Sequence, residues 1–241
     1  MRPSMPPIAT STNALWYRQP DPSGKFRRGP ARLTALILAL VIMTLGKAGQ
    51  ASPALFGYQE TRQADITLFK QWLDALERHV RLDVAETAAD CSETRFNACH
   101  LREWENFIET IRAEPLAIQL QRINDHANRK RYVLDIDNYG MLDYWAVARE
   151  FLYNGGDCED YAITKLFSLR WLGLETERLR IVVLQDTNLR IPHAVLAVYA
   201  DDDIYILDNQ IRQVVRHRDI VHYVPVYSIN ESNWWIHTPF L

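Results

Sequence analysis

The chain has 241 residues, 48% of them hydrophobic, which is enough for a sizeable buried core in one or two domains. Its 27 basic and 30 acidic side chains leave a formal net charge of −3, and outside the N-terminus no stretch is rich in Lys and Arg. This charge distribution argues against a protein that binds nucleic acid.

Residues 1–51 are typical of a secretory signal that follows a long N-terminal extension. Basic residues precede an uncharged apolar stretch at 33–45, and small residues come after it. The 13 residues of this stretch are fewer than the roughly 20 that a membrane-spanning helix needs. We expect cleavage after Ala51 and export of residues 52–241. The alternative is an uncleaved anchor with the domain still outside the cytoplasm.

Export determines how the three cysteines are interpreted. In an oxidising compartment Cys91 and Cys99, eight positions apart, can close a small disulfide loop, which leaves Cys158 unpaired. A free cysteine in an exported protein needs a chemical reason, and catalysis is the reason we favour. The alternative is that Cys91 and Cys99 are two free thiols or metal ligands.

The first half of the exported segment is predicted to be helical. Apolar side chains recur at helical spacing over residues 62–84 and 101–127, and Pro115 is expected to interrupt the second stretch. Residues 128–144 are polar and irregular, which indicates a loop.

One more helix and a set of strands follow. The helix begins at Cys158, directs its apolar side chains inward and is expected to end at Gly173. Strand-like segments come next, at residues 179–185, 193–199, 204–208 and 223–229. Helices first and an antiparallel sheet afterwards indicate a single α+β domain, with the Cys158 helix packed on the sheet.

Residues 154–162 read Asn-Gly-Gly-Asp-Cys-Glu-Asp-Tyr-Ala and contain the most informative residue of the chain, Cys158. A cysteine at a helix N-terminus feels the positive end of the helix dipole, which lowers the pKa of its thiol. His193 begins one apolar strand and Asp208 ends the next. A thiol, a base and an orienting carboxylate in this order form a candidate nucleophilic triad. Taken singly, each residue has an alternative interpretation: Cys158 as a small buried hydrophobic residue, His193 as a structural histidine and Asp208 as part of a turn.

The turn between the two strands decides whether His193 and Asp208 can meet. A two-residue turn within residues 200–202 places them either directly opposite each other or diagonally on the same face of the sheet. A three-residue turn without a bulge would place them on opposite faces, and the triad could not form. The sequence allows all three arrangements.

Three carboxylates crowd the candidate nucleophile. Asp157, Glu159 and Asp160 surround Cys158, and like charges raise the pKa of a thiol that should ionise. A bound divalent cation would reverse that effect. Together with the loop at residues 135–143, these acids can supply the oxygen ligands that calcium takes. The alternative is helix capping, since acids in a first turn are favourable without a metal.

Eight short motifs occur in a characteristic order. They are Asp-Ile-Asp-Asn-Tyr-Gly at 135–140, Asp-Tyr-Trp at 143–145, Gly-Gly-Asp-Cys-Glu-Asp-Tyr-Ala at 155–162, Asp-Thr-Asn-Leu at 186–189, His-Ala-Val-Leu-Ala-Val-Tyr at 193–199, Leu-Asp-Asn at 207–209, Val-Tyr-Ser-Ile-Asn at 226–230 and Trp-Trp at 234–235. In these motifs the chain resembles the bacterial transglutaminase-like cysteine proteinases of the LapG type.

This resemblance implies a papain-like, transglutaminase-like core and a periplasmic, calcium-dependent protease. Members of the family cut the N-terminal retention region of a giant surface adhesin, usually at an Ala-Ala site, and so release biofilm cells. An inner-membrane cyclic-di-GMP receptor of the LapD type sequesters the protease. By resemblance, the triad is Cys158, His193 and Asp208. Asp157 and Glu159 would bind calcium, and Asp160 is added to them on proximity alone.

Two classes of function follow from these observations. The first is a cysteine endopeptidase. The second is a calcium-regulated binding module on the same fold, in which the thiol is unused. An acyl transferase is a variant of the first class, because it shares the acyl-enzyme and differs only in the acceptor.

Overall fold

The computed structural model describes residues 54–81 and 98–240. The predicted signal segment at residues 1–51 lies outside the described residues. Cys91 and the side chain of Cys99 also lie outside them, and the disulfide expected between the two stays a prediction. Within the described part, no helix has the length and apolar character that crossing a membrane requires.

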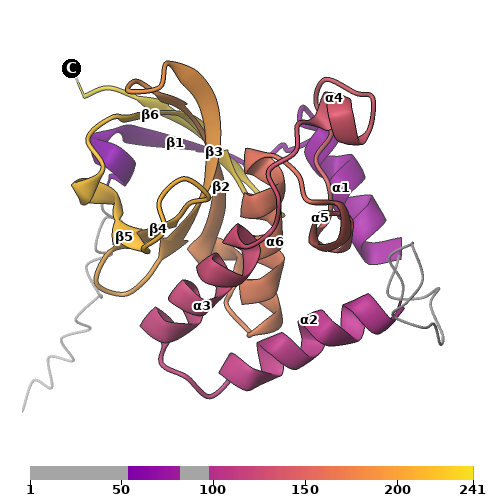
Figure 1. Cartoon of the computed structure of the whole chain (residues 1–241). Helices are drawn as coiled ribbons and strands as arrows, with labels where there is room; N and C mark the ends of the chain where they lie inside the picture. The colour runs from indigo at the N-terminus through magenta and orange to yellow at the C-terminus, as the bar shows by residue number, and fades with distance from the viewer. Residues whose placement is uncertain (1–53, 82–97, 241) are drawn as a thin grey trace, which may run out of the picture. The chain divides into compact units, whose positions relative to one another are not determined.

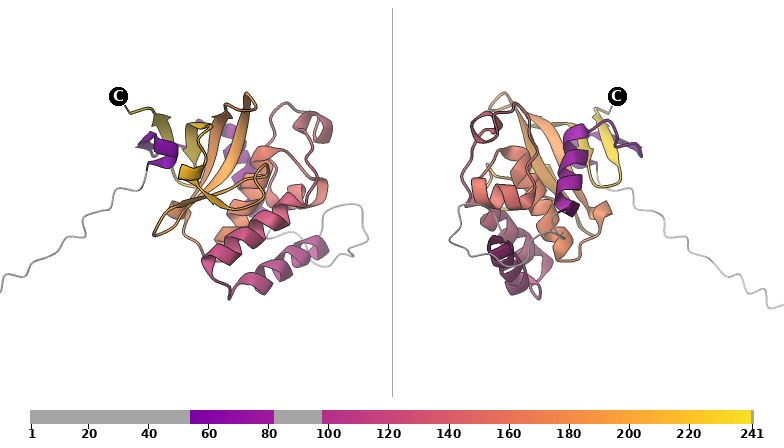
Figure 2. Two further views of the ribbon diagram at one scale, coloured as in Figure 1. Left: turned by 60° about the vertical axis from the view of Figure 1, so that its left-hand side comes forward. Right: turned by 90° about the vertical axis from the view of Figure 1, so that its right-hand side faces the viewer.

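The described strands form one antiparallel sheet in the order β1-β7-β6-β2-β3-β4-β5. The strands are β1 (Gln59–Gln63), β2 (Leu179–Asp186), β3 (Ile191–Tyr199), β4 (Ile204–Leu207), β5 (Val215–Arg216), β6 (Tyr223–Ile229) and β7 (Trp234–Thr238). The α-helices are α1 (Lys70–Arg81), α2 (Ala98–Ile111), α3 (Leu116–Asn128), α4 (Asp135–Asn138), α5 (Ala148–Asn154) and α6 (Cys158–Trp171). The α-helices gather on one side of the sheet (Figures 1 and 2). The α+β class is therefore confirmed.

Helix α6 lies against the centre of the sheet (Figure 1). It contacts strands β2 and β3 on one side and helices α3 and α5 on the other. Because it is surrounded in this way, residues 160–169 are all buried, including every apolar residue expected to face inward. Gly173 has a φ of 98°, a left-handed conformation that ends the helix as predicted.

Both faces of the central strands are covered by side chains. On β2, Ile181 belongs to the core shared with the helices, whereas its neighbour Val182 belongs to a second core on the far face. Leu55 and Tyr223 are part of that second core. Because side chains alternate along a strand, β2 and β3 are held from both sides. Residues at the ends of these strands are therefore well placed to be held in fixed positions.

The predicted helix at 62–84 is wrong in its first part. Gln59–Gln63 form strand β1, which pairs with β7, and helix α1 begins only at Lys70. The partner strand lies at the other end of the chain, so local periodicity carries no sign of the pairing. The second helical stretch divides at Pro115, as expected, into α2 and α3. Helices α4 and α5 are not predicted from the sequence, because four and seven residues are too few for a clear periodic pattern.

Candidate active site

Two glycines place Cys158 at the first position of helix α6. Gly155 has a φ of 77°, and a Cβ atom there would lie 2.3 Å from the backbone oxygen of Arg131. A Cβ atom at Gly156 would lie 2.0 Å from a carboxylate oxygen of Asp160. The chain passes so close to its neighbours that neither position accommodates a side chain. The Gly-Gly pair therefore sets the direction in which the thiol enters the site.

Asp160 holds the start of this helix. Its Oδ2 accepts a hydrogen bond from the backbone N–H of Asp157 at 3.1 Å, and its Oδ1 accepts one from Ala146 N–H at 2.6 Å. The carboxylate is buried, and burial is the main reason its pKa lies well above the ordinary value, with the charge of Glu159 adding to it. Both oxygens thus accept hydrogen bonds from backbone N–H groups. The role of Asp160 as a metal ligand stays a prediction.

His193 and Asp208 lie side by side in the sheet. Strands β3 and β4 pair Leu196 with Leu207, which makes His193 and Asp208 diagonal neighbours on one face. The two-residue turn with diagonal placement is therefore the arrangement that forms. The Nε2 atom of His193 is 2.9 Å from Oδ1 of Asp208, and the two residues are 2% and 1% exposed.

Two further residues fix the Asp208 carboxylate. The hydroxyl of Tyr223 donates to Oδ2 at 2.6 Å, and the backbone N–H of Gln210 donates to Oδ1 at 2.8 Å. Burial alone would raise the pKa of Asp208, but the hydrogen bonds and the nearby imidazole hold it below its ordinary value. The carboxylate is therefore ionised at neutral pH, so the Nε2–H of His193 donates to it and Nδ1 is the basic nitrogen.

The thiol lies beside the strand that carries the histidine. The backbone N–H of Ala194, directly after His193, faces the Cys158 sulfur and lowers the pKa of its thiol. This contact follows from the packing of α6 against β3. The cysteine itself is half-buried. The structure thus brings the cysteine helix, the histidine strand and the aspartate turn to one place.

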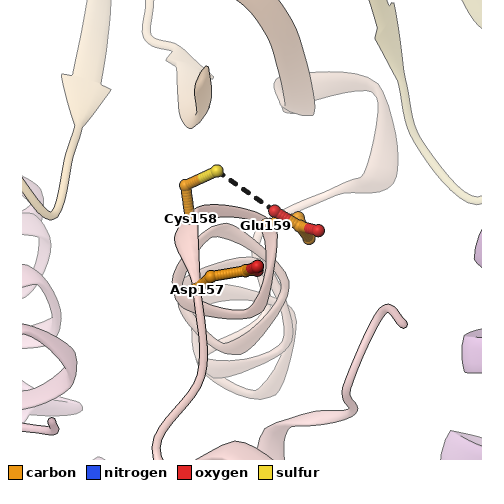
Figure 3. Close-up of side chains that lie close together, drawn as sticks. All are labelled: Asp157, Cys158 and Glu159. Carbon is orange, nitrogen blue, oxygen red and sulfur yellow. Dashed lines mark hydrogen bonds between the residues drawn. The ribbon is translucent and has the colours of Figure 1, made fainter. Parts of the chain in front are cut away.

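Two acidic residues, Asp157 and Glu159, lie next to Cys158 at the start of α6 (Figure 3). The Cys158 thiol donates a hydrogen bond of 3.1 Å to Oε2 of Glu159. Burial raises the pKa of Cys158 above its ordinary value, and the charges of Glu159 and Asp157 raise it further. Burial and the neighbouring Glu159 also raise the pKa of Asp157 to about 8. In this arrangement the helix dipole does not suffice to ionise the nucleophile.

The loop before the helix adds acids to this cluster. Val133 N–H donates to Gly156 O at 2.9 Å, and the Asn138 side chain donates to Gly155 O at 3.2 Å, so the loop is attached to the glycine turn. This attachment sets Asp135 beside the start of α6. Burial and the charge of Asp157 raise the pKa of Asp135 to about 6.

The acids have the composition of a site for a hard cation. In each of two groups, the candidate ligand atoms lie within 4.8 Å of one another: Asp135 with Asp143 and Glu159, and Asp135 with Asp157 and Asp160. Oδ1 of Asp135 and Oδ1 of Asp157 are buried, and neither has a hydrogen-bond partner among the described residues. Carboxylate oxygens are the ligands that calcium prefers. These residues therefore fit a calcium ion.

Lys165 is a buried cation that the sequence analysis did not single out. It lies on α6 and is 0% exposed, and in the described part of the chain its Nζ has no hydrogen-bond partner. Nζ lies 5.6 Å from the centre of the Tyr161 ring. Burial lowers the pKa of Lys165 to about 7, although the charge of Asp208 opposes the shift. A lysine on the inward face of a predicted core helix was the available signal.

The chain is similar to a known family and to solved structures. The family model for bacterial transglutaminase-like cysteine proteinases matches residues 87–238. A structure of LapG from Legionella pneumophila is 30% identical, with a TM-score of 0.53, and the match covers 67% of this chain and 87% of that one. Calcium-bound LapG of the same organism is 28% identical, with a TM-score of 0.54 and the same coverage. EGTA-treated LapG is 29% identical, with a TM-score of 0.54, over 68% and 86%. No curated protein matches.

Proposed function

The chain belongs to the bacterial transglutaminase-like cysteine proteinases, and we propose that it is a calcium-dependent endopeptidase with Cys158, His193 and Asp208 as its triad. The observation that carries this proposal is the buried 2.9 Å pair of His193 and Asp208, with His193 on strand β3, which packs against the cysteine helix α6. The similarity to the LapG structures, which are 28% and 30% identical over 67% of this chain, also supports it.

In the proposed reaction, Cys158 Sγ attacks the scissile carbonyl carbon while His193 Nδ1 accepts the thiol proton. His193 then gives this proton to the leaving amine, and a thioester to Cys158 remains. A water molecule, deprotonated by His193, attacks the thioester, which releases the carboxylic acid and restores the thiol. Asp208 keeps the proton on Nε2 and stabilises the imidazolium. Backbone N–H groups at the start of α6 can stabilise the oxyanion.

Calcium is proposed for the acidic cluster. Asp157 and Glu159 would hold it, together with Asp135 and Asp143 from the adjacent loop. A bound cation would supply positive charge that offsets the acids and favours the thiolate of Cys158. The support is the two unpartnered carboxylate oxygens in the described residues and the calcium-bound and EGTA-treated forms of the similar LapG structures.

We also propose a substrate and a location by resemblance to the family. The substrate is the N-terminal retention region of a large surface adhesin, cut at an Ala-Ala site, so that the protein controls release of biofilm cells. The protein would act in the periplasm and be sequestered by an inner-membrane cyclic-di-GMP receptor of the LapD type. The predicted signal at residues 1–51 supports export.

The test is to incubate the calcium-loaded protein with large exported proteins of the same cell and to sequence the N-terminus of each new fragment. We expect one defined cut in a large adhesin and none with Cys158→Ala protein. Crosslinked products instead of fragments would favour the acyl transferase. Absence of any product would contradict the proposed endopeptidase activity.

A further inference from the structure

A groove of about 570 Å³ lies between helix α3 and the segment that follows Asp208. Arg122 and Asp125 line it from α3, Arg129 lines it from the C-cap directly after α3, and Arg212 lines it from the facing segment. Arg122, Asp125 and Arg129 are three and four positions apart, and the C-cap residue Arg129 keeps helical backbone angles, so the three lie on one face. The groove therefore carries three guanidinium groups and a single carboxylate.

Among the described residues, the arginines of this groove have no acidic partner. In residues 54–81 and 98–240, none of Arg122, Arg129 and Arg212 forms an ion pair, and all three are exposed. Arg129 Nε donates only to the backbone oxygen of Asp125, at 3.2 Å. The Asp125 carboxylate accepts a hydrogen bond of 3.0 Å from Gln121. Like charges gathered in a cleft attract a ligand of the opposite sign.

The groove adjoins the candidate triad. Asn209 and Gln210, the two residues after Asp208, form part of its lining. The Gln210 side-chain amide lies 3.4 Å from Nδ1 of His193, the nitrogen that would accept the proton of the Cys158 thiol. Gln210 therefore links the groove to the histidine of the candidate triad.

Amide side chains on α3 hold the facing wall in place. Asn128 donates to the backbone oxygen of Asp208 at 2.7 Å, and Asn124 donates to that of Arg212 at 3.0 Å. Gln121 accepts from Val214 N–H at 2.9 Å. The backbone of Asp208 and Arg212 is thus held against α3 before a ligand binds, which reduces the entropy lost on binding.

We propose that this groove, here called the arginine groove, binds an acidic segment of the substrate polypeptide next to the scissile bond. The proposal rests on the proposed endopeptidase function and adds a sequence preference to it. Guanidinium groups form paired hydrogen bonds with carboxylates, which suits Asp and Glu side chains. The acids around Cys158 would repel the same segment. The two charged regions together would fix the direction in which the substrate lies.

The test measures binding of two fluorescein-labelled peptides to Cys158→Ala protein in calcium by fluorescence anisotropy. Both peptides contain a central Ala-Ala, with flanking Asp and Glu in one and flanking Asn and Gln in the other. We expect about tenfold tighter binding of the acidic peptide, since each exposed charge pair contributes a few-fold at most. The preference should weaken with added salt and disappear when Arg122, Arg129 and Arg212 are all changed to Gln.

The control is Arg81→Gln, which removes an exposed arginine that pairs with Glu77 on α1. This variant should keep the full preference. Equal affinity for the two peptides, or a preference that survives the triple change, would overturn the proposal. So would a short oligonucleotide that binds more tightly than the acidic peptide.

Cleavage by the protein with Cys158 intact separates this proposal from the proposed function. If neither peptide is cut but the acidic one binds through the arginines, the result supports the proposal for the arginine groove. It contradicts the proposed endopeptidase activity at an Ala-Ala site. If both are cut equally and bound equally, the endopeptidase stands and the groove proposal fails.

Discussion

The two halves of the candidate site, which we call the base half and the nucleophile half, differ in how well their polar groups are satisfied. In the base half, both oxygens of Asp208 accept hydrogen bonds, from His193, Tyr223 and the Gln210 backbone. In the nucleophile half, Cys158 faces Glu159, and buried oxygens of the acidic cluster have no partner in the described chain. The base half is complete as folded, whereas the nucleophile half carries an excess of negative charge.

This difference follows from where the residues lie in the fold. The base half is built on strands β3, β4 and β6, which neighbouring strands and side chains hold from both faces. The acids of the nucleophile half come from helix α4 and the loop after it, from the N-cap of α6 and from its first turn. A sheet fixes geometry by itself, but clustered carboxylates need a positive charge to be stable when ionised. The sheet therefore positions His193 and Asp208, whereas a cation is needed to activate the Cys158 thiol.

The largest expected effect is that of Cys158→Ala, which should abolish proteolysis. The change removes only a sulfur atom at a helix start, so the melting temperature should shift by a few degrees at most. Peptide cleavage and calorimetry on the same preparation check both points. Retained cleavage by a folded variant would end the endopeptidase hypothesis.

The base half is tested by Asp208→Asn, which keeps the size but removes the charge that orients His193. We expect kcat to fall by roughly 10²–10³, less than the value of about 10⁴ known for a serine triad, because cysteine and histidine can begin from an ion pair. A variant within a factor of about three of the unchanged protein would show that another group orients the imidazole.

The nucleophile half is tested by removing the metal. Chelation should lower activity by about 10² or more, because the thiolate fraction falls tenfold for each unit by which the thiol pKa rises above the ambient pH. Calcium should restore activity and magnesium should do so poorly, since magnesium requires a tighter octahedron. Asp157→Ala and Glu159→Ala should resemble the chelated protein. Activity that is indifferent to calcium in stripped protein would contradict the calcium assignment.

A smaller effect is expected from Tyr223→Phe, which removes one hydrogen bond to Asp208. Hydrogen bonds to charged groups contribute about 1.5–3 kcal/mol, so kcat should fall by roughly 10- to 100-fold. The matched control is Tyr205→Phe, whose hydroxyl donates to the exposed Asp202 instead. Equal activity of the two variants would show that Tyr223 does not support the triad.

The smallest effect concerns stability and pH in metal-free protein. Asp157 has a pKa of about 8 when folded and about 4 when unfolded, so between these values the folded state holds more protons. By linkage, the free energy of unfolding must then fall as pH rises through this window. The melting temperature of stripped protein should decline from pH 5 to about 8, and its gain on adding calcium should grow. Asp157→Asn should flatten the decline; an equal decline in that variant would exclude Asp157 as its cause.

The sequence predicts most of what is local in this site. The Gly-Gly-Asp-Cys stretch identifies the helix start, and the apolar runs next to His193 and Asp208 identify two strands joined by a short turn. The length of the turn and the register remained to be decided, because the same pattern allows two pairings with a two-residue turn and one with a three-residue turn.

The contributions missing from the prediction depend on contacts between distant segments. Tyr223 reaches Asp208 because of the folded sheet, and nothing near position 223 indicates this. Lys165 lies among apolar residues, so only its burial beside the charge of Asp208 makes it notable. Strand β1 was missed for the same reason, because its pairing with the distant strand β7 overrides the local helical pattern.

The most direct test of the claim that the nucleophile half depends on a cation is the alkylation rate of Cys158 by iodoacetamide, followed at that residue by mass spectrometry. In stripped protein at neutral pH the rate should be low, because a thiol rather than a thiolate faces the reagent. Calcium should raise it by about tenfold or more, and Asp157→Ala protein should show no such response. Equal alkylation rates with and without calcium would contradict the account.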